Sequence, residues 1–193
     1  MSTESVDDVI VRFLEHGDDA ARMALAETGL LGLDRILDLC LGRAAGPLAA
    51  TPGMPSGKDA VDAQSAALYV VACAHPSEFI DAIQRETIPY PLAILGDIDD
   101  PRATGILCGH LDDENWLTRY NAIAALGRRS DDAAKLCAER CLADPHLVVR
   151  SKAIEAVSKW DSGRARQLYG ELLAADGLTP LLRQIVESAL RDL

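Results

Sequence analysis

A segment in the second half of this 193-residue chain occurs twice at a constant offset. The stretch "WLTRYNAIAAL" (116–126) matches "LVVRSKAIEAV" (147–157), with arginine, alanine and isoleucine coinciding 31 residues apart. The same offset pairs residues of the preceding helix and turn, among them Asp113 and Asp144. The repeated unit therefore contains two helices. A chain of such units is expected to stack them so that neighbours bury each other's apolar stripes.

Two further copies flank this pair. The stretch "PLLRQIVESAL" (180–190) repeats the pattern at an offset of 33, and its two extra residues fall in the loop "AADGLTP". In the other direction, "PYPLAILGDIDDPRA" (89–103) keeps the Leu-Gly pair that ends the helix of the later copy. This unit is degraded, because proline stands where the later copies have alanine. Repeats are therefore expected over residues 88–193.

The copies "DDPRATGILCGHLDDENWLTRYNAIAALG" and "ADPHLVVRSKAIEAV" resemble HEAT-like repeats of the short bacterial type, also called phycobilisome-lyase-type HEAT repeats. The resemblance covers about residues 88–193. It implies an all-α fold, a right-handed α-α superhelix or α-solenoid, whose second helices line a concave surface. It implies little about function, because the family includes scaffolds, lyase subunits that handle bilins, and DNA-repair proteins.

Residues 1–87 show helical patterning without a clear period. Helices are predicted at about 4–16, 17–28, 30–43, 59–74 and 76–86. We interpret this half as a diverged helical cap on a single α-solenoid domain spanning 1–193, with a separate domain as the alternative. The stretch "GRAAGPLAATPGMPSG" (42–57) is too long for an ordinary hairpin turn, and it is expected to be either a mobile loop or an ordered binding loop.

Charge and composition limit the classes of partner. Only 4% of residues are aromatic, which favours closely packed helices over an all-β fold. The net charge of -11 would repel phosphate backbones and anionic lipid. Nucleic acid is therefore disfavoured, and a protein partner with a basic surface is favoured.

The chain is expected to be a soluble, cytoplasmic protein that does not enter a membrane. It does not open with a signal-peptide pattern, and "SAALYVVACA" (65–74) is about half of the ~20 residues that a membrane span needs. Its five cysteines contain no C-x-x-C pair and sit in apolar runs, where a free cysteine behaves as a small hydrophobe. Unpaired thiols in a reducing compartment are expected.

The residue types used in catalysis do not form a recognisable constellation. Cys137 and Cys141, four residues apart, could combine with His110 and His146 as metal ligands, but Cys137 aligns with Ile106 and so occupies a core position. Carboxylate pairs stand just before predicted helices, where capping explains them: Asp7–Asp8, Asp18–Asp19, Asp99–Asp100, Asp112–Asp113 and Asp131–Asp132. No catalytic, cofactor-binding or metal-binding residue is predicted, and the protein is expected to be non-enzymatic.

An arginine recurs at one position of each second helix: Arg119, Arg150 and Arg183. A planar guanidinium with five donors suits a structural ladder, in which each arginine bonds a neighbouring aspartate or the carbonyls at a helix end. Asp113 and Asp144 are the expected partners. The alternative is a basic functional face.

The predicted function is a protein-protein interaction adaptor or scaffold that binds its partner on the concave face. The partner-binding candidates are large or polar residues of the second helices: Trp116, Tyr120, Asn121, Arg128, Lys152, Lys159 and Gln184. Two alternatives stay open. One is a bilin-lyase-like cofactor-handling subunit, which only the resemblance suggests. The other is a nucleic-acid-binding HEAT protein, which would need a continuous basic face.

Overall fold

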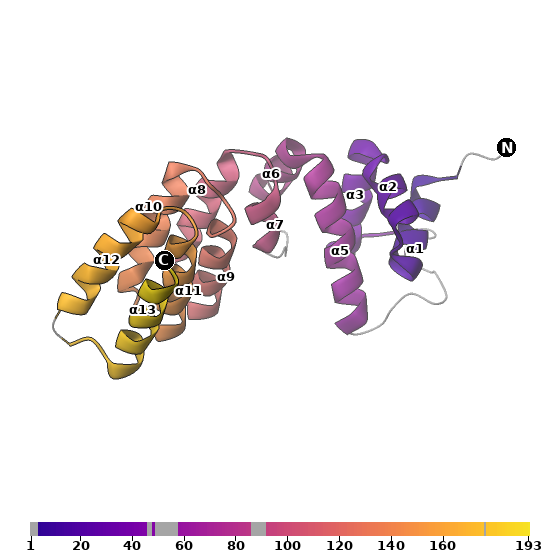
Figure 1. The fold of residues 1–193 in the computed structure, drawn as a ribbon. Helices are drawn as coiled ribbons and strands as arrows, with labels where there is room; N and C mark the ends of the chain where they lie inside the picture. The colour runs from indigo at the N-terminus through magenta and orange to yellow at the C-terminus, as the bar shows by residue number, and fades with distance from the viewer. Residues whose placement is uncertain (1–3, 46–47, 49–57, 86–91, 176) are drawn as a thin grey trace. The chain divides into compact units, whose positions relative to one another are not determined.

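The computed structural model describes residues 4–45, 48, 58–85, 92–175 and 177–193. In this part of the chain all regular structure is helical. The chain divides into two compact units: an N-terminal unit of residues 1–94 and 98–100, and a repeat unit of residues 95–97 and 101–193. Figure 1 shows the helices of both units in chain order. The predicted 42–57 loop lies mostly outside the described residues.

The N-terminal unit is built around one long helix. Its helices are α1 (Val6–His16), α2 (Asp19–Ala26), α3 (Gly29–Cys40), α5 (Lys58–Ala74) and α6 (Pro76–Arg85). They confirm the five predicted helices to within a few residues. Helix α5 packs against each of the other four. The core consists of fully buried apolar side chains, including Ile10, Leu25, Ile36, Leu68 and Ile80. Whether this unit caps a single solenoid domain stays a prediction.

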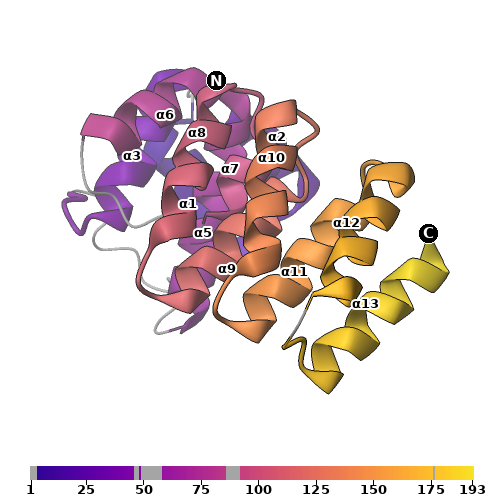
Figure 2. The same cartoon turned by 90° about the vertical axis from the view of Figure 1, so that its left-hand side faces the viewer.

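The repeat unit consists of helical hairpins. Its helices are α8 (Arg102–Gly109), α9 (Trp116–Leu126), α10 (Asp132–Arg140), α11 (Leu147–Ser158), α12 (Ser162–Ala174) and α13 (Pro180–Asp192), and the short α7 (Ala93–Asp97) precedes them in the chain. Each first helix packs against the second helix that follows it. The second helices α9, α11 and α13 lie side by side in that order (Figure 2). The predicted all-α solenoid is confirmed for this unit.

Glycine permits close packing between successive second helices. A Cβ atom on Gly127 would lie 3.0 Å from the Cβ of Ala156 in the next repeat. One period earlier, a Cβ on Gly96 would lie 2.8 Å from the carbonyl oxygen of Ala125. Both separations are at or below the limit of ordinary contact. The Leu-Gly pair therefore persists in the degraded copy because the backbones approach closely there.

Aspartates begin several helices as predicted. The Asp18 carboxylate accepts a hydrogen bond from the Ala21 N–H at 2.7 Å, and Asp131 accepts one from Ala134 at 2.9 Å. Asp8 forms a capping box with Ser5. Each of these carboxylates satisfies an N–H that has no partner within its helix. The capping interpretation is confirmed for the pairs that contain Asp8, Asp18 and Asp131. It is wrong for Asp99–Asp100 and Asp112–Asp113, because the N-cap of α8 is Pro101 and that of α9 is Asn115.

The expectation of five free cysteines is wrong. Cys108 on α8 and Cys137 on α10 form a disulfide, with their Cα atoms 6.0 Å apart. These cysteines occupy different positions of the repeat, so the alignment of copies did not pair them. First helices of successive repeats nevertheless pack together and bring them into contact. Cys40 and Cys141 are free thiols.

Among the described residues, no single helix is long and apolar enough to cross a membrane. One bent pair, Val61–Ala74 with Pro76–Arg85, passes a test of length and composition, with an angle of 119° between its helices.

Candidate interaction surface

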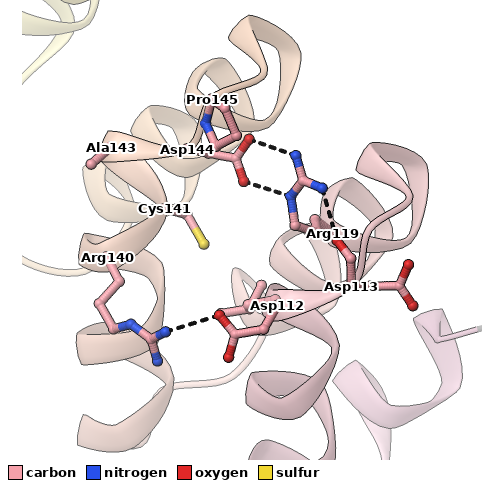
Figure 3. Close-up of a pocket in the computed structure, with 9 residues that line it drawn as sticks. Asp112, Asp113, Arg119, Arg140, Cys141, Ala143, Asp144 and Pro145 are labelled. Carbon is pink, nitrogen blue, oxygen red and sulfur yellow. Dashed lines mark hydrogen bonds and ion pairs between the residues drawn. The ribbon is translucent and has the colours of Figure 1, made fainter.

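Arg119 joins two successive repeats. Its Nε and Nη2 donate hydrogen bonds to the two carboxylate oxygens of Asp144 at 2.8 and 3.0 Å, and its Nη1 donates to the carbonyl oxygen of Asp113 at 2.8 Å (Figure 3). Both charged side chains of the pair are buried. The guanidinium therefore connects the turn of its own repeat to the turn of the next one.

The surroundings of this pair keep it ionised. Burial opposes the charge on Asp144, but hydrogen bonds from Arg119 and from the His146 N–H outweigh it and lower the pKa of the carboxyl below its usual value. The hydrogen bond to Asp144 raises the pKa of Arg119. A buried pair of this kind is costly to break, because the remaining charge has no partner.

Arg150 repeats half of this arrangement. Its Nη1 donates to the carbonyl oxygens of Asp144 at 2.6 Å and Pro145 at 3.2 Å, which are the equivalents of the turn carbonyls that Arg119 uses. Among the described residues, the Nε of Arg150 has no hydrogen-bond partner. The predicted structural ladder is thus confirmed for Arg119, which bonds the aspartate of the next repeat. Arg150 contributes to it through the carbonyl oxygens of the turn before its own helix.

Arg183 continues the ladder through a helix-end carbonyl. It is exposed, and its Nη2 donates a hydrogen bond of 3.4 Å to the carbonyl oxygen of Leu173, in the last turn of α12. The last copy therefore uses a helix-end carbonyl where Arg119 uses an aspartate.

A pocket of about 320 Å³ lies at the Arg119 junction (Figure 3). Arg140 donates a hydrogen bond to Asp112 across it at 3.2 Å. Cys141 lines the pocket, and burial together with the nearby Asp144 raises the pKa of its thiol to about 11. The thiol is therefore protonated at neutral pH and is a poor nucleophile. The two arginines of the pocket, Arg119 and Arg140, both pair with aspartates. The charged groups of this junction therefore hold successive repeats together.

The metal-ligand combination considered from sequence does not assemble. Cys137 is committed to the disulfide. Within the described ranges, no group of three or more histidine, cysteine or acidic side chains is placed to hold a metal ion.

The exposed face of the second helices carries an apolar row. Leu117, Val148 and Leu181 each stand at the second position of their helix, at the repeat offsets of 31 and 33. Their exposed fractions are 47%, 43% and 53%. Packed helices lie about 8–10 Å apart, so the row presents an apolar side chain at about that interval. We refer to these three residues as the apolar row.

Trp116 lies beside the apolar row. Its ring stacks on that of His146, with ring centroids 4.3 Å apart and planes 10° from parallel. The tryptophan stays 39% exposed. The stack orders a large aromatic surface at the start of α9, next to Leu117, and so provides a rigid flank for the apolar row.

The predicted basic candidates on this face have acidic partners. Lys152 pairs with Glu155 and lies 5.5 Å from the centre of the Tyr120 ring. Lys159 pairs with the same Glu155 at 2.9 Å. Arg128 pairs with Asp97 at 2.7 Å, which ties α9 to α7. These contacts give Arg128 a structural role as well as a place on the surface.

The uncharged candidates are more available. Asn121 and Gln184 are exposed, and Tyr120 is half-buried beside Lys152. Tyr120, Ser151 and Gln184 occupy equivalent positions three residues after the apolar row, so they extend the same face. Five of the seven candidates lie on second helices, and Arg128 and Lys159 lie just after the ends of α9 and α11. Their role in binding stays a prediction.

A groove of about 530 Å³ separates α11 from α13 on this face. Ile154, Ile185 and Ala189 provide its apolar lining, and Glu155 and Lys159 are among its charged residues. It begins within one helical turn of Val148 and Leu181. The groove and the apolar row therefore form one continuous surface.

Comparison with known proteins supports the repeat architecture. A family model described as HEAT repeats matches residues 92–158 and, in an overlapping placement, residues 107–191. The two placements together span more than half of the chain. No curated protein matches. The matched region contains the hairpins from α8 to α13, including the apolar row and the Arg119 junction.

Proposed function

We propose, from the premise that this chain belongs to the HEAT-repeat family, that it is a non-enzymatic adaptor whose second helices bind a segment of another protein. Stacked helical repeats commonly serve as scaffolds for protein interaction, because they present one extended surface across several units. A location in the cytoplasm belongs to the same proposal.

The apolar row is the observation that carries this proposal. A side chain that only packs the solenoid is buried, whereas these three are about half exposed and recur at one repeat position. Contiguous exposed apolar surface marks an interaction site. A segment in the polyproline II conformation advances about 3.1 Å per residue and returns every third side chain to the same face, so apolar side chains at every third residue match the interval between second helices. The occupant is therefore a polyproline II segment with that spacing.

The contacts of the basic residues argue against the nucleic-acid alternative. A basic face would need Arg119, Arg128, Arg129, Arg150, Lys152 and Lys159 to present their charges together. Five of the six pair with an aspartate or glutamate of the repeat unit, and Arg150 donates to the turn carbonyls of Asp144 and Pro145. The counterion release that drives binding to phosphate backbones would have to break these pairs first.

The bilin-handling alternative also lacks support from the groove. Attachment or coordination of such a cofactor uses cysteine or histidine side chains. The residues that line the groove between α11 and α13 are aliphatic, hydroxyl-bearing or charged. The resemblance to phycobilisome-lyase-type repeats therefore gives no support for a bilin site in this groove.

Selection of displayed peptides tests the proposal. A random library of segments about ten residues long, sufficient to span the row, is selected against the wild-type protein. We expect enrichment of apolar residues at every third position. The triple variant Leu117→Ser, Val148→Ser, Leu181→Ser should bind the selected peptides at least about tenfold more weakly.

Leu136→Ser is the matched control, because Leu136 is 64% exposed on α10 but lies outside the row. It should retain binding. Circular dichroism must show that all variants stay equally helical. Equal peptide affinity for the wild type and the triple variant would refute the apolar row as the site.

A further inference from the structure

The disulfide joins the two repeats that carry the first two members of the apolar row. Cys108 lies on the first helix of one hairpin and Cys137 on the first helix of the next. The 29-residue separation encloses all of α9. Since α8 packs on α9 and α10 packs on α11, the bond constrains both hairpins from the layer opposite the row.

We propose that the Cys108–Cys137 bond is a reversible thiol-disulfide clamp that tightens this two-repeat junction and thereby regulates binding at the apolar row. Its effect on binding rests on the proposed function. Its redox chemistry and its effect on stability do not.

The junction has enough other contacts to stay folded when the bond is open. Arg119 pairs with Asp144 across it. On the same side as the disulfide, the Thr104 hydroxyl of α8 donates a hydrogen bond to the Asp131 carboxylate at the start of α10, at 2.7 Å. Gly127 also packs closely on the next repeat. The disulfide therefore adjusts an interface that already exists, as a switch between two folded states requires.

A third cysteine lies close to the bond without entering the exchange. Cys141 is one helical turn after Cys137 and is buried. Its thiol is protonated at neutral pH, whereas attack on a disulfide requires a thiolate. Internal rearrangement to a Cys137–Cys141 or Cys108–Cys141 bond is thus suppressed. Exchange therefore requires a partner from outside the protein, a disulfide to close the bond or a thiol to open it.

The exchange partner is a small or protein-borne disulfide, with oxidised glutathione as the simplest example. The thiolate of one cysteine attacks a sulfur of oxidised glutathione, forms a mixed disulfide and releases one glutathione thiolate. The second cysteine's thiolate then attacks the protein sulfur of the mixed disulfide and releases the other glutathione. Two protein thiols lose two electrons and two protons, and oxidised glutathione becomes two molecules of reduced glutathione. An excess of reduced glutathione drives the same steps backwards.

Opening the clamp has two consequences. A crosslink that closes a loop of about 30 residues restricts the unfolded chain, so its loss should lower the melting temperature of the repeat unit by about 5–15 °C. The hairpins that carry Leu117 and Val148 also gain freedom to move relative to each other. Peptide binding then has to order them, which should weaken affinity by about 3–10-fold.

The first experiment needs no partner. Wild-type protein is equilibrated in glutathione buffers of increasing reduced fraction, approached from both directions, and free thiols are alkylated with a mass-shifting maleimide. Melting is followed by tryptophan fluorescence, because Trp116 and Trp160 are the chain's two tryptophans and both lie in the repeat unit. Two thiols should appear and disappear reversibly, and the melting temperature should fall as they appear. A bond that persists under a large excess of reduced glutathione, or that never forms, would overturn the proposal.

The second experiment addresses regulation. Cys108→Ser with Cys137→Val mimics the open clamp, and valine suits a position where the preceding copy has Ile106. Cys40→Ser, at a free cysteine of the N-terminal unit, is the control and should behave as wild type. The selected peptides should bind oxidised wild type more tightly than reduced wild type or the double variant.

The outcomes are separable. Equal affinity in both redox states would refute regulation even if the thiols respond. If no selected peptide binds either state, the proposed function fails, while alkylation and melting still decide whether the clamp exists.

Discussion

The N-terminal unit carries 16 acidic and 6 basic residues, whereas the repeat unit carries 14 acidic and 13 basic residues. Almost all of the chain's net charge of -11 therefore belongs to the N-terminal unit. The overall acidity consequently says little about the surface that the second helices present, because the repeat unit is nearly neutral. An argument from net charge has to be made for each unit.

The two units also use their charges differently. In the repeat unit, ion pairs connect one copy to the next, as Arg119 does with Asp144 and Arg164 does with Glu139. In the N-terminal unit, Arg35 of α3 pairs with Asp7 of α1 at 2.8 Å, but other carboxylates such as Asp18 cap exposed helix starts and need no cation. A repeat brings turns together and encloses their carboxylates, which then require a paired arginine. Exposed helix starts carry no such requirement, so acidic residues can accumulate.

Removing one carboxylate should give the largest effect and confine it to the repeat unit. Asp144→Ala leaves the buried Arg119 guanidinium without its partner, which should lower the free energy of unfolding by about 3–5 kcal/mol. Urea denaturation followed by tryptophan fluorescence measures this in the repeat unit. Hydrogen exchange of α1 and α5 should stay near the wild-type rate. A uniform loss of protection in both units would contradict the comparison.

Asp113→Ala is the matched control. Asp113 stands at the equivalent position and accepts the Asn115 N–H, as Asp144 accepts the His146 N–H. It offers its carbonyl, and no carboxylate oxygen, to Arg119. Its loss should therefore cost about 0.5–2 kcal/mol. Equal losses at the two positions would show that the turn, and not the buried ion pair, holds the junction.

A second comparison separates glycines that serve repeat packing from those that do not. Gly96→Ala would place a Cβ 2.8 Å from a backbone oxygen of α9 and should destabilise the repeat unit by about 1–3 kcal/mol. Gly105→Ala, inside α8 with no atom within 4 Å of the added Cβ, should stabilise it by about 0.5–1 kcal/mol. Denaturant midpoints of the two variants should shift in opposite directions. Shifts in the same direction would refute the close approach at Gly96.

The repeat fold was predictable because its period is explicit in the sequence, and the Arg119–Asp144 bond followed from the recurrence of both residues at one offset. The apolar row was missed, although its members obey the same offsets. Val148 is adjacent in sequence to the buried Val149, and apolarity alone does not tell a buried side chain from an exposed one. The signal that could have revealed the row was an apolar residue that recurs at the repeat offsets but lies outside the buried stripe of each helix.

The disulfide was missed for a different reason. Cys108 and Cys137 are not repeat equivalents, so comparing copies places them in unrelated columns. Only the packing of α8 on α10 brings them together. Arg128 was predicted as a surface residue although its partner Asp97 stands at the equivalent position of the degraded copy, 31 residues earlier. Contacts between non-equivalent positions require the register of the hairpins, which the period alone does not supply.

Acid should affect the repeat unit through its paired carboxylates. Hydrogen bonds from Thr104 and Ala134 hold the pKa of Asp131 below its unfolded value of 3.8 despite opposing burial, and the pKa of Asp144 is lowered as well. A depressed folded pKa contributes stability that is fully present well above 3.8 and is lost as pH falls through the folded value. Urea midpoints by tryptophan fluorescence should therefore hold from neutral pH to above 4 and then decline. The dependence should be weaker in Asp144→Ala, which has lost one of these groups.

Salt should give the smallest effect and one that differs in sign between the units. Raising sodium chloride from about 0.05 to about 0.5 M screens the self-repulsion of the acidic N-terminal unit and should stabilise it by a few tenths of a kcal/mol. In the repeat unit the same screening weakens exposed pairs such as Arg140 with Asp112, so its stability should stay constant or fall slightly. Urea is the denaturant of choice because it adds no ions, and hydrogen exchange read separately over α5 and α11 gives both responses in one sample. A parallel response in the two units would mean that net charge acts through specific salt binding or solvent effects, and that the division of charge between the units does not govern their stability.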